Sequence, residues 1–430
     1  MNLAERALVT AAERAAADAE RRTELWSRGF TRRRFLAGAG MVGAAALGSQ
    51  LVTTRYSYAA PGTGTGRALV VVFLRGGFDG LAAVVPAGDP DYLTARPSIG
   101  VPAEVLLPLD RRFGLHPALG GLHGFWTSGQ LGIVHAVGGG PGVTRSHFQA
   151  MDHVERGVDT PSTRTGWLER ALEAAGPGTT FRSVSEGTSL PSSLAGLGTA
   201  VALRGVDLVT LNRGSERMTT ALRGLFSGLD HVAADQVDLA LTVLSEAQAL
   251  RATPYVPVKG VSYPAGNFGS AMSDVARLVK ADVGLRVATV DVGGWDLHSN
   301  AGPIEDGDMT YHLTGLGNTL AAFGTDLGER LADVTVVTMS EFGRRVAENG
   351  SGGTDHGGGN AMLLLGGRVA GGLVHGGWPG LATEALVDGD VPGVNDYRNV
   401  LAELARAQLG IGSVASVFPG HSYVPLGVVR

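Results

Sequence analysis

The sequence predicts an α/β protein with a doubly wound, mostly parallel sheet, and three observations carry this prediction. Short runs rich in β-branched residues alternate along the chain with longer segments of helical periodicity. The runs are apolar at nearly every position, which is typical of strands that helices cover on both faces. The chain has 430 residues, of which 44% are hydrophobic, so it can bury the core of one large domain.

The predicted elements run from residue 68 to residue 409. Strands are expected at residues 68–74, 131–137, 285–291, 334–339 and 361–365. Helices are expected at residues 116–126, 146–156, 166–175, 236–251, 268–281, 313–330 and 400–409. Between residues 160 and 265, clusters of Pro, Gly and Ser interrupt the pattern, so we expect an inserted cap in this region.

The first sixty residues have the organisation of an export signal. Three arginines, Arg32 to Arg34, precede an apolar run of small residues, and Ser57 to Ala60 offers a cleavage site. The adjacent arginines are typical of the twin-arginine route, which predicts a periplasmic, cell-surface or extracellular protein. An uncleaved anchor is the alternative, but the run is rich in Gly and Ala and too weakly apolar for a stable membrane span. Residues 61–430 are then expected to form a single domain.

The composition excludes several classes of function. The net charge is −5, and it becomes −9 without residues 1–60, which hold nine arginines and five acidic residues. This balance argues against a nucleic-acid partner. The chain has no cysteine, so disulfides, thiolate metal sites and a cysteine nucleophile are all excluded.

Polar residues of the kinds found in metal sites adjoin the predicted strands. Ligands of open α/β sheets bind beyond the carboxyl ends of the strands, so we expect these side chains to share one edge of the sheet. Carboxylate and imidazole ligands suit zinc, manganese or iron, and an all-oxygen set suits calcium. The candidate ligands of a divalent metal ion are Asp79, Asp296, His298, Glu341 and His356.

Each candidate ligand also has a purely structural interpretation. Asp79 could shape the Gly-rich turn after the first strand. Asp296 and His298 could pair with each other in a loop, and Glu341 could pair with a nearby arginine. His356 is the hardest to explain structurally, because glycines on both sides of it make its loop costly to order.

Other residues are candidates for the chemistry itself. Ser146 or Thr144 could act as a nucleophile near the start of a helix, although Ser146 could equally serve as its N-cap. His147 could transfer a proton. The remaining candidates, which we expect to contact the anionic part of a substrate, are Arg145, Arg344 and Asp355.

Several long motifs together resemble one bacterial family, the domain-of-unknown-function 1501 family of exported proteins. The motifs include FLRGGFDGLAAVVP, RSHFQAMD, GGWDLHSN and MSEFGRRVAENGSGGTDHGGGNAMLLLGG, and the resemblance covers nearly all of residues 66–430. The family is similar in fold to the alkaline phosphatase and sulfatase superfamily. The resemblance implies metal binding by Asp79 and His356, and a nucleophile at Ser146 or Thr144. Genes of the family often neighbour those of another exported family, which implies an exported partner protein.

The sequence departs from that superfamily at two points. Phe342 stands where the superfamily has a histidine, and Asp296-Leu-His298 is shorter than the expected spacing. One metal, or a set dominated by oxygen ligands, is therefore expected in place of two zinc ions. The resulting expectation is an exported metal-dependent hydrolase of phosphate-, phosphonate- or sulfate-type esters. The alternatives are a non-catalytic exported protein that binds a ligand or partner, and a metal-dependent phosphomutase-like isomerase.

Overall fold

The computed structural model describes residues 66–139, 144–158, 162–196, 200–210, 216–226 and 232–430. The predicted export signal, residues 1–60, lies outside the described residues. Within the described part of the chain, no helix combines the length and the apolar character needed to cross a bilayer.

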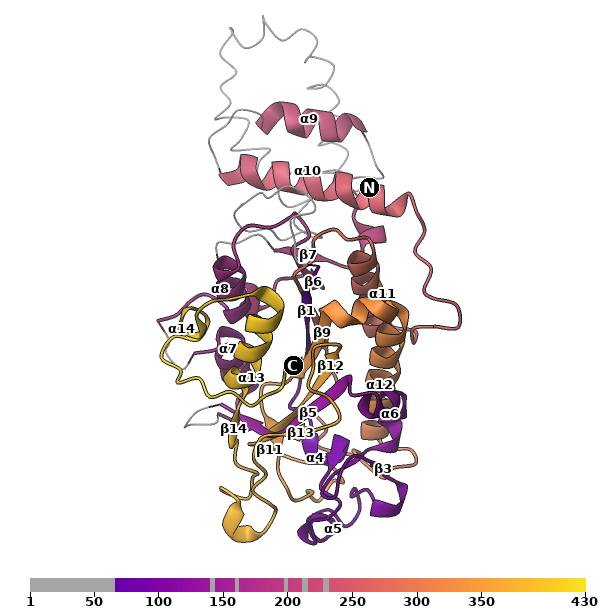
Figure 1. The fold of residues 1–430 in the computed structure, drawn as a ribbon, viewed down its shortest axis with the longest axis vertical. Coiled ribbons are helices and arrows are strands. Elements are labelled where there is room, and N and C mark those ends of the chain that lie inside the picture. The colour runs from indigo at the N-terminus through magenta and orange to yellow at the C-terminus, as the bar shows by residue number, and fades with distance from the viewer. Residues whose placement is uncertain (1–65, 140–143, 159–161, 197–199, 211–215, 227–231) are drawn as a thin grey trace, which may run out of the picture.

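A nine-stranded sheet forms the centre of the molecule, as the sequence predicts (Figure 1). Every described strand of this sheet is parallel to β1 except β12, which is antiparallel to both of its neighbours. The predicted fold class, α/β with a mostly parallel sheet, is thus confirmed. In spatial order the strands are β13 (Val374–His375), β5 (Leu131–Gly138), β12 (Asn360–Gly366), β9 (Val334–Met339), β1 (Ala68–Leu74), β8 (Val287–Val292), β6 (Ser183–Glu186) and β7 (Val201–Leu203), and β14 (Asn395–Asp396) also pairs with β5.

Helices cover both faces of the sheet, and the alternation of side chains along β1 explains why (Figure 1). Val70, Val72 and Leu74 are buried against one group of helices, while Leu69 and Val71 are buried against the other. One face is covered by α6 (Gly120–Thr127), α11 (Asn267–Lys280) and α12 (Asp308–Leu327), and the other by α7 (His147–Arg156), α8 (Trp167–Ala174), α13 (Tyr397–Leu404) and α14 (Val414–Val417).

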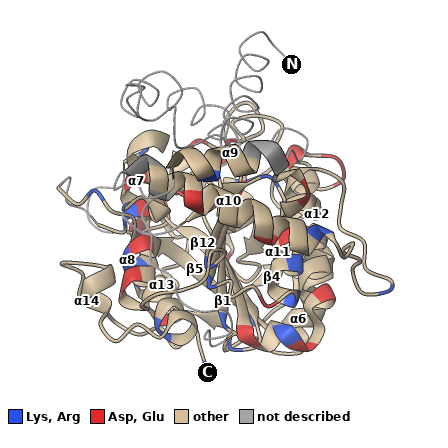
Figure 2. Ribbon diagram, turned by 90° about the horizontal axis from the view of Figure 1, so that it is seen from above, with Lys and Arg blue, Asp and Glu red and all other residues tan. Residues whose placement is uncertain are grey.

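The segment 160–265 differs from the predicted cap. Two of its strands, β6 and β7, belong to the main sheet, and the sequence pattern missed them because they are only four and three residues long. The remaining pair of helices, α9 (Glu216–Phe226) and α10 (Val232–Arg251), lies at one end of the molecule, opposite the end that holds β11 (His356–Gly357) (Figure 1). These two helices therefore do not cover the region around His356. Acidic and basic residues are interspersed along the helices seen from the α9–α10 end (Figure 2).

Short elements connect the sheet to the site. The turn after β1 leads into α4 (Gly80–Ala83), and α5 (Asp91–Ala95) follows. A small sheet is built from β2 (Val84–Val85), β4 (Gly114–Leu115) and β3 (Leu107–Pro108), and β10 (Gly343–Arg344) pairs with β11.

One buried carboxylate ties the segment between α10 and α11 to the body of the domain. Asp326 on α12 is 1% exposed and accepts hydrogen bonds from Tyr255, from Tyr263 and from the backbone amide of Val258. The Nζ atom of Lys280 lies 2.5 Å from its Oδ1 atom. Four donors around one carboxylate satisfy a buried charge that would otherwise be strongly destabilising.

Candidate metal centre

Three imidazoles and one carboxylate meet at the carboxyl ends of the strands. His147 is the first residue of α7, Asp296 and His298 follow β8, and His356 lies in β11. The Nε2 atom of His356 lies 3.1 Å from that of His147 and 3.0 Å from that of His298. The carboxylate of Asp296 lies 3.1 Å from His298 and from His356, and 3.5 Å from His147. We call these four residues the imidazole cluster.

The outer nitrogen of each imidazole faces a hydrogen-bond acceptor. The Nδ1 atom of His147 lies 2.8 Å from a carboxylate oxygen of Glu341, and that of His298 lies 3.0 Å from Asp355. The Nδ1 atom of His356 lies 2.9 Å from the backbone carbonyl of Arg145. Carboxylates and carbonyls only accept, so each Nδ1 atom is the donor and carries the proton.

This tautomer leaves the Nε2 atoms of the neutral rings without protons. Their lone pairs then point toward one another and toward the carboxylate of Asp296 at about 3 Å, an arrangement that repels unless a cation lies among them. Imidazoles that ligate metals are held in the same way, with the second ring nitrogen bonded to a carboxylate or a carbonyl. The donor set therefore fits a divalent ion, and nitrogen and oxygen ligands suit zinc, manganese or iron.

The cluster is open to solvent on one side. The side chains of Asp296 and His298 are 47% and 45% exposed, whereas those of His147 and His356 are 26% and 20% exposed. Burial raises the pKa of Asp296, but its polar neighbours, foremost the hydrogen-bonded and positively charged Arg344, outweigh that effect, so the net pKa is lowered. The carboxylate is thus ionised at neutral pH and can serve as a ligand.

The glycine-rich turn after β1 brings the supporting groups together. The amide of Gly76 donates to Glu341 at 2.8 Å. A Cβ atom on Gly76, whose φ is +122°, would lie 2.5 Å from the backbone nitrogen of Asp296. Only glycine allows the turn to approach the Asp296 loop this closely. The Arg344 guanidinium completes the link, since it donates to the carbonyls of Gly76 and Gly77 and to Asp296 at 2.5 Å.

Three residues predicted for other roles act here as supports. Glu341, a predicted ligand, accepts from His147 and from the amide of Gly76 and so orients one imidazole. Asp355, a predicted substrate contact, orients His298. Arg344, predicted to hold an anion, is 2% exposed and has its donors committed to the protein.

Asp79 lies apart from the imidazole cluster. Its carboxylate pairs with Arg96 at 2.8 and 3.1 Å, and both side chains are buried. It also accepts from the amides of Leu81 and Ala82, so it caps α4. The predicted role of Asp79 as a ligand does not fit this placement, and the structural alternative, shaping the turn, does. No sequence pattern had singled out its partner, Arg96.

The residues at the start of α7 show a mixed outcome. His147, predicted to transfer protons, lies among the potential ligands. It supplies an imidazole to a cluster that receives none from Phe342, the residue that stands where the superfamily has a histidine. Ser146 is exposed and makes no capping hydrogen bond through its side chain, so its alternative role as an N-cap is not realised. Thr144 donates to Gln149 and accepts from the amide of Ser146. The side chain of Arg145 pairs with Asp390 at 2.6 Å.

Sequence analysis also missed one supporting residue, Asn349. Its side-chain amide donates to the carbonyl of His298 at 2.9 Å and to Asp355 at 3.2 Å. It lies in a polar, glycine-rich loop with no neighbouring signal that would have singled it out.

The family comparison agrees with the motifs. The family described as "Protein of unknown function (DUF1501)" matches residues 123–395, a segment that contains all four residues of the imidazole cluster. The chain belongs to this family. The predicted membership in DUF1501 is therefore confirmed, and no curated protein matches the sequence.

Several solved structures share a general likeness with this DUF1501 protein. The PsFucS1 sulfatase from Pseudoalteromonas sp. is 11% identical with a TM-score of 0.35, and the match covers 93% of this chain and 77% of that one. Ps i-CgsB in complex with k-i-k-neocarrahexaose is 10% identical with a TM-score of 0.33, covering 81% and 73%. The lipoteichoic acid synthase LtaP from Listeria monocytogenes is 8% identical with a TM-score of 0.25, covering 76% and 71%. At TM-scores this low, the likeness says nothing about the chemistry of the site.

Proposed function

We propose that this DUF1501 protein is a metal-dependent hydrolase of phosphate-, phosphonate- or sulfate-type esters. The observation that carries the proposal is the imidazole cluster, whose three Nδ1 atoms are each held by a separate acceptor. A divalent ion held there would polarise an ester oxygen and lower the pKa of a bound water. His147, His298, His356 and Asp296 would be the ligands, and Glu341 and Asp355 would orient two of them.

Ser146 is the candidate nucleophile of this proposal. It directly precedes His147 at the N-terminus of a ten-residue helix, and its side chain is exposed and not used as a cap. The positive end of the helix dipole favours an alkoxide at this position. Thr144 is the second candidate, although its hydroxyl already donates to Gln149 at 2.9 Å.

The proposal is tested by metal content together with hydrolysis. The purified protein, prepared without chelator or affinity metal, is expected to hold zinc, manganese, iron or calcium near stoichiometry by elemental mass spectrometry. The His356→Ala variant should lose the metal and the hydrolysis of aryl phosphates, phosphonates or sulfates. His123→Ala is the matched control, because that histidine bonds the carbonyl of Pro108 outside the cluster. A protein that binds no divalent metal after reconstitution, and a His356→Ala variant that behaves like the wild type, would refute the proposal.

A second candidate is a non-catalytic protein that binds a ligand or an exported partner through this site. One observation favours it: three arginines in segments that adjoin the cluster are already paired. Arg75 lies 2.5 Å from Glu155 and 3.0 Å from Asp291, Arg145 pairs with Asp390, and Arg344 pairs with Asp296. Metal bound at stoichiometry without hydrolysis of any ester would favour this candidate.

The cellular location stays part of the proposal. The arginine pair and the apolar run in residues 1–60 support export by the twin-arginine route. Cell fractionation of the wild type against Arg32→Lys and Arg33→Lys tests it, since the variants should stay in the cytoplasm.

A further inference from the structure

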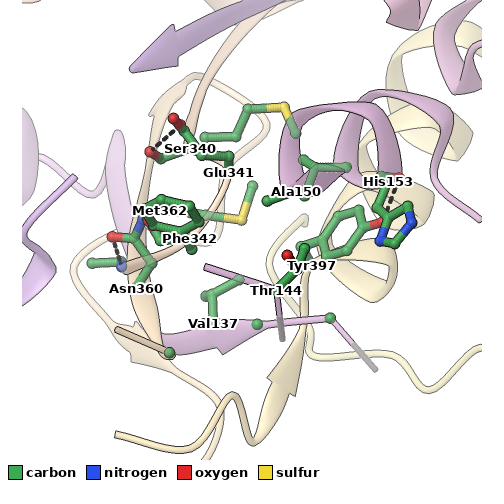
Figure 3. Close-up of a pocket in the computed structure, with 16 residues that line it drawn as sticks. Val137, Thr144, Ala150, His153, Ser340, Glu341, Phe342, Asn360, Met362 and Tyr397 are labelled. Carbon is green, nitrogen blue, oxygen red and sulfur yellow. Dashed lines mark hydrogen bonds between the residues drawn. The ribbon is translucent and has the colours of Figure 1, made fainter. Parts of the chain in front are cut away.

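A cavity of about 160 Å³ lies beside the imidazole cluster, between the sheet and two of its covering helices (Figure 3). The carboxyl ends of β5 and β9, the start of β12, α7 and the first residue of α13 form its walls. The apolar side chains that line it are Val137, Ala150, Val154, Met339, Phe342, Ala361 and Met362, and the ring of Tyr397 also faces it.

We propose that this cavity binds the organic part of the ester substrate, and that this part is a small, uncharged, apolar group about the size of a benzene ring. The inference rests on the proposed function, since it assigns the anionic part of the same ester to the imidazole cluster. Charge, hydrogen bonding, size and position each support the assignment.

The polar groups in the walls offer few free hydrogen bonds. Four of them already donate to partners within the protein, so a polar ligand would have to displace these bonds. The bonds run from Thr144 to Gln149 at 2.9 Å, from Ser340 to the carbonyl of Leu74 at 2.6 Å, from Asn360 to the carbonyl of Phe342 at 2.8 Å, and from Tyr397 to the carbonyl of His153 at 3.3 Å.

The charge of the walls excludes an anion. Among the described residues that line the cavity, Glu341 is the carboxylate and none is Lys or Arg. A phosphate, sulfate or carboxylate group placed here would face that carboxylate without a Lys or Arg in the described walls to compensate it. The anionic part of the ester therefore belongs on the other side of Glu341, at the imidazole cluster.

Two residues are shared by the cavity and the cluster. Glu341 lines the cavity and lies 2.8 Å from the Nδ1 atom of His147. The Phe342 ring also lines the cavity, and its centroid lies 4.9 Å from that of His147 and 4.7 Å from that of His356. The cavity and the cluster therefore share two wall residues, Glu341 and Phe342.

The volume sets the size of the group. Apolar cavities of about 150 Å³ in proteins bind benzene. The thioethers of Met339 and Met362 are flexible and polarisable, so they can adapt to a ring edge or to a short branched alkyl group.

Binding of phenol to the full-length protein tests the inference without relying on turnover. Saturation-transfer NMR or calorimetry should detect phenol, and Ala150→Leu, which fills the cavity from α7, should weaken its binding about tenfold or more. Met362→Ala, which enlarges the cavity, should shift the preference from phenol toward 1-naphthol. Phenol binding should persist in His356→Ala, which leaves the cavity walls unchanged.

The possible outcomes distinguish failure of the cavity assignment from failure of the hydrolase proposal. If phenol does not bind, or if Ala150→Leu and Met362→Ala both bind it as the wild type does, the inference is overturned whatever the enzyme hydrolyses. If phenol binds as expected and no phenyl ester is cleaved, the cavity assignment stands and the hydrolase proposal fails. If both hold, phenyl esters should show a higher KM in Ala150→Leu than in the wild type.

Discussion

The substitution Asp79→Asn separates a metal ligand from a structural ion pair. Asp79 and Arg96 are 2% and 0% exposed, and two of their N–O distances are 2.8 and 3.1 Å. Asparagine keeps an oxygen that can accept from the amides of Leu81 and Ala82, so the change removes the charge while it preserves the cap of α4. The guanidinium of Arg96 is then left buried without its counter-ion.

The expected cost follows from that uncompensated charge. Breaking a buried ion pair by removing one partner costs about 3–5 kcal/mol. In a domain of this size, where each kcal/mol lowers the melting temperature by about 2 °C, the loss corresponds to roughly 6–10 °C. Metal content should not change, because Asp79 lies outside the imidazole cluster.

Thermal unfolding followed by circular dichroism, with and without chelator, measures the cost. Asp110→Asn is the matched control, since Asp110 also accepts from two backbone amides of its own turn but is exposed. We expect it to change the stability by less than about 0.5 kcal/mol. If Asp79→Asn instead loses its metal while the chelated protein melts at the wild-type temperature, the structural assignment of Asp79 is wrong.

Three further predictions concern the site and its surroundings. Asp355→Asn should weaken metal affinity about 10- to 100-fold by loosening His298, as measured by competition with a chromophoric chelator; unchanged affinity would deny Asp355 a supporting role. Burial and the neighbouring Asp274 raise the pKa of Glu186 well above its usual value. Folding stability is therefore lost as the pH rises above the unfolded-state pKa, near 4.3. Glu186→Gln should stabilise the protein at pH 7, by about 1.4 kcal/mol for each pH unit between the unfolded and folded pKa of Glu186, and should have no effect at pH 4. Gly77→Ala should cost about 1–3 kcal/mol in denaturant unfolding, because φ is +77° and the new Cβ would lie 2.5 Å from the Phe342 ring.

The sheet was predictable because its central strands carry their own signal. The runs Ala68–Leu74 and Val334–Met339 are buried at every position, and Leu131–Gly138 is buried at all but its last, as strands covered on both faces require. The strands at the β6–β7 edge are too short to show a period, so their place in the sheet depends on pairing with β8, which local sequence does not encode.

The meeting of these side chains was predictable from the strand ends, but their individual contacts were not. His147, Asp296, His298 and His356 do lie together at one edge of the sheet. Asp296 faces the Nε2 atom of His356 whereas Glu341 faces the Nδ1 atom of His147, so the two carboxylates lie on different sides of the rings. Such differences arise from the packing of loops that are far apart in sequence.

The carboxylate of Asp326 has a practical consequence, because the whole chain contains only two lysines, Lys259 and Lys280. The amine of Lys280 is bound to Asp326 in the folded protein, whereas Lys259 is exposed. An acylating reagent should therefore modify Lys259 quickly and Lys280 only when its ion pair with Asp326 opens. The rate of acylation at Lys280, read by mass spectrometry of peptides, therefore measures local opening between α11 and α12, and it needs no engineered label.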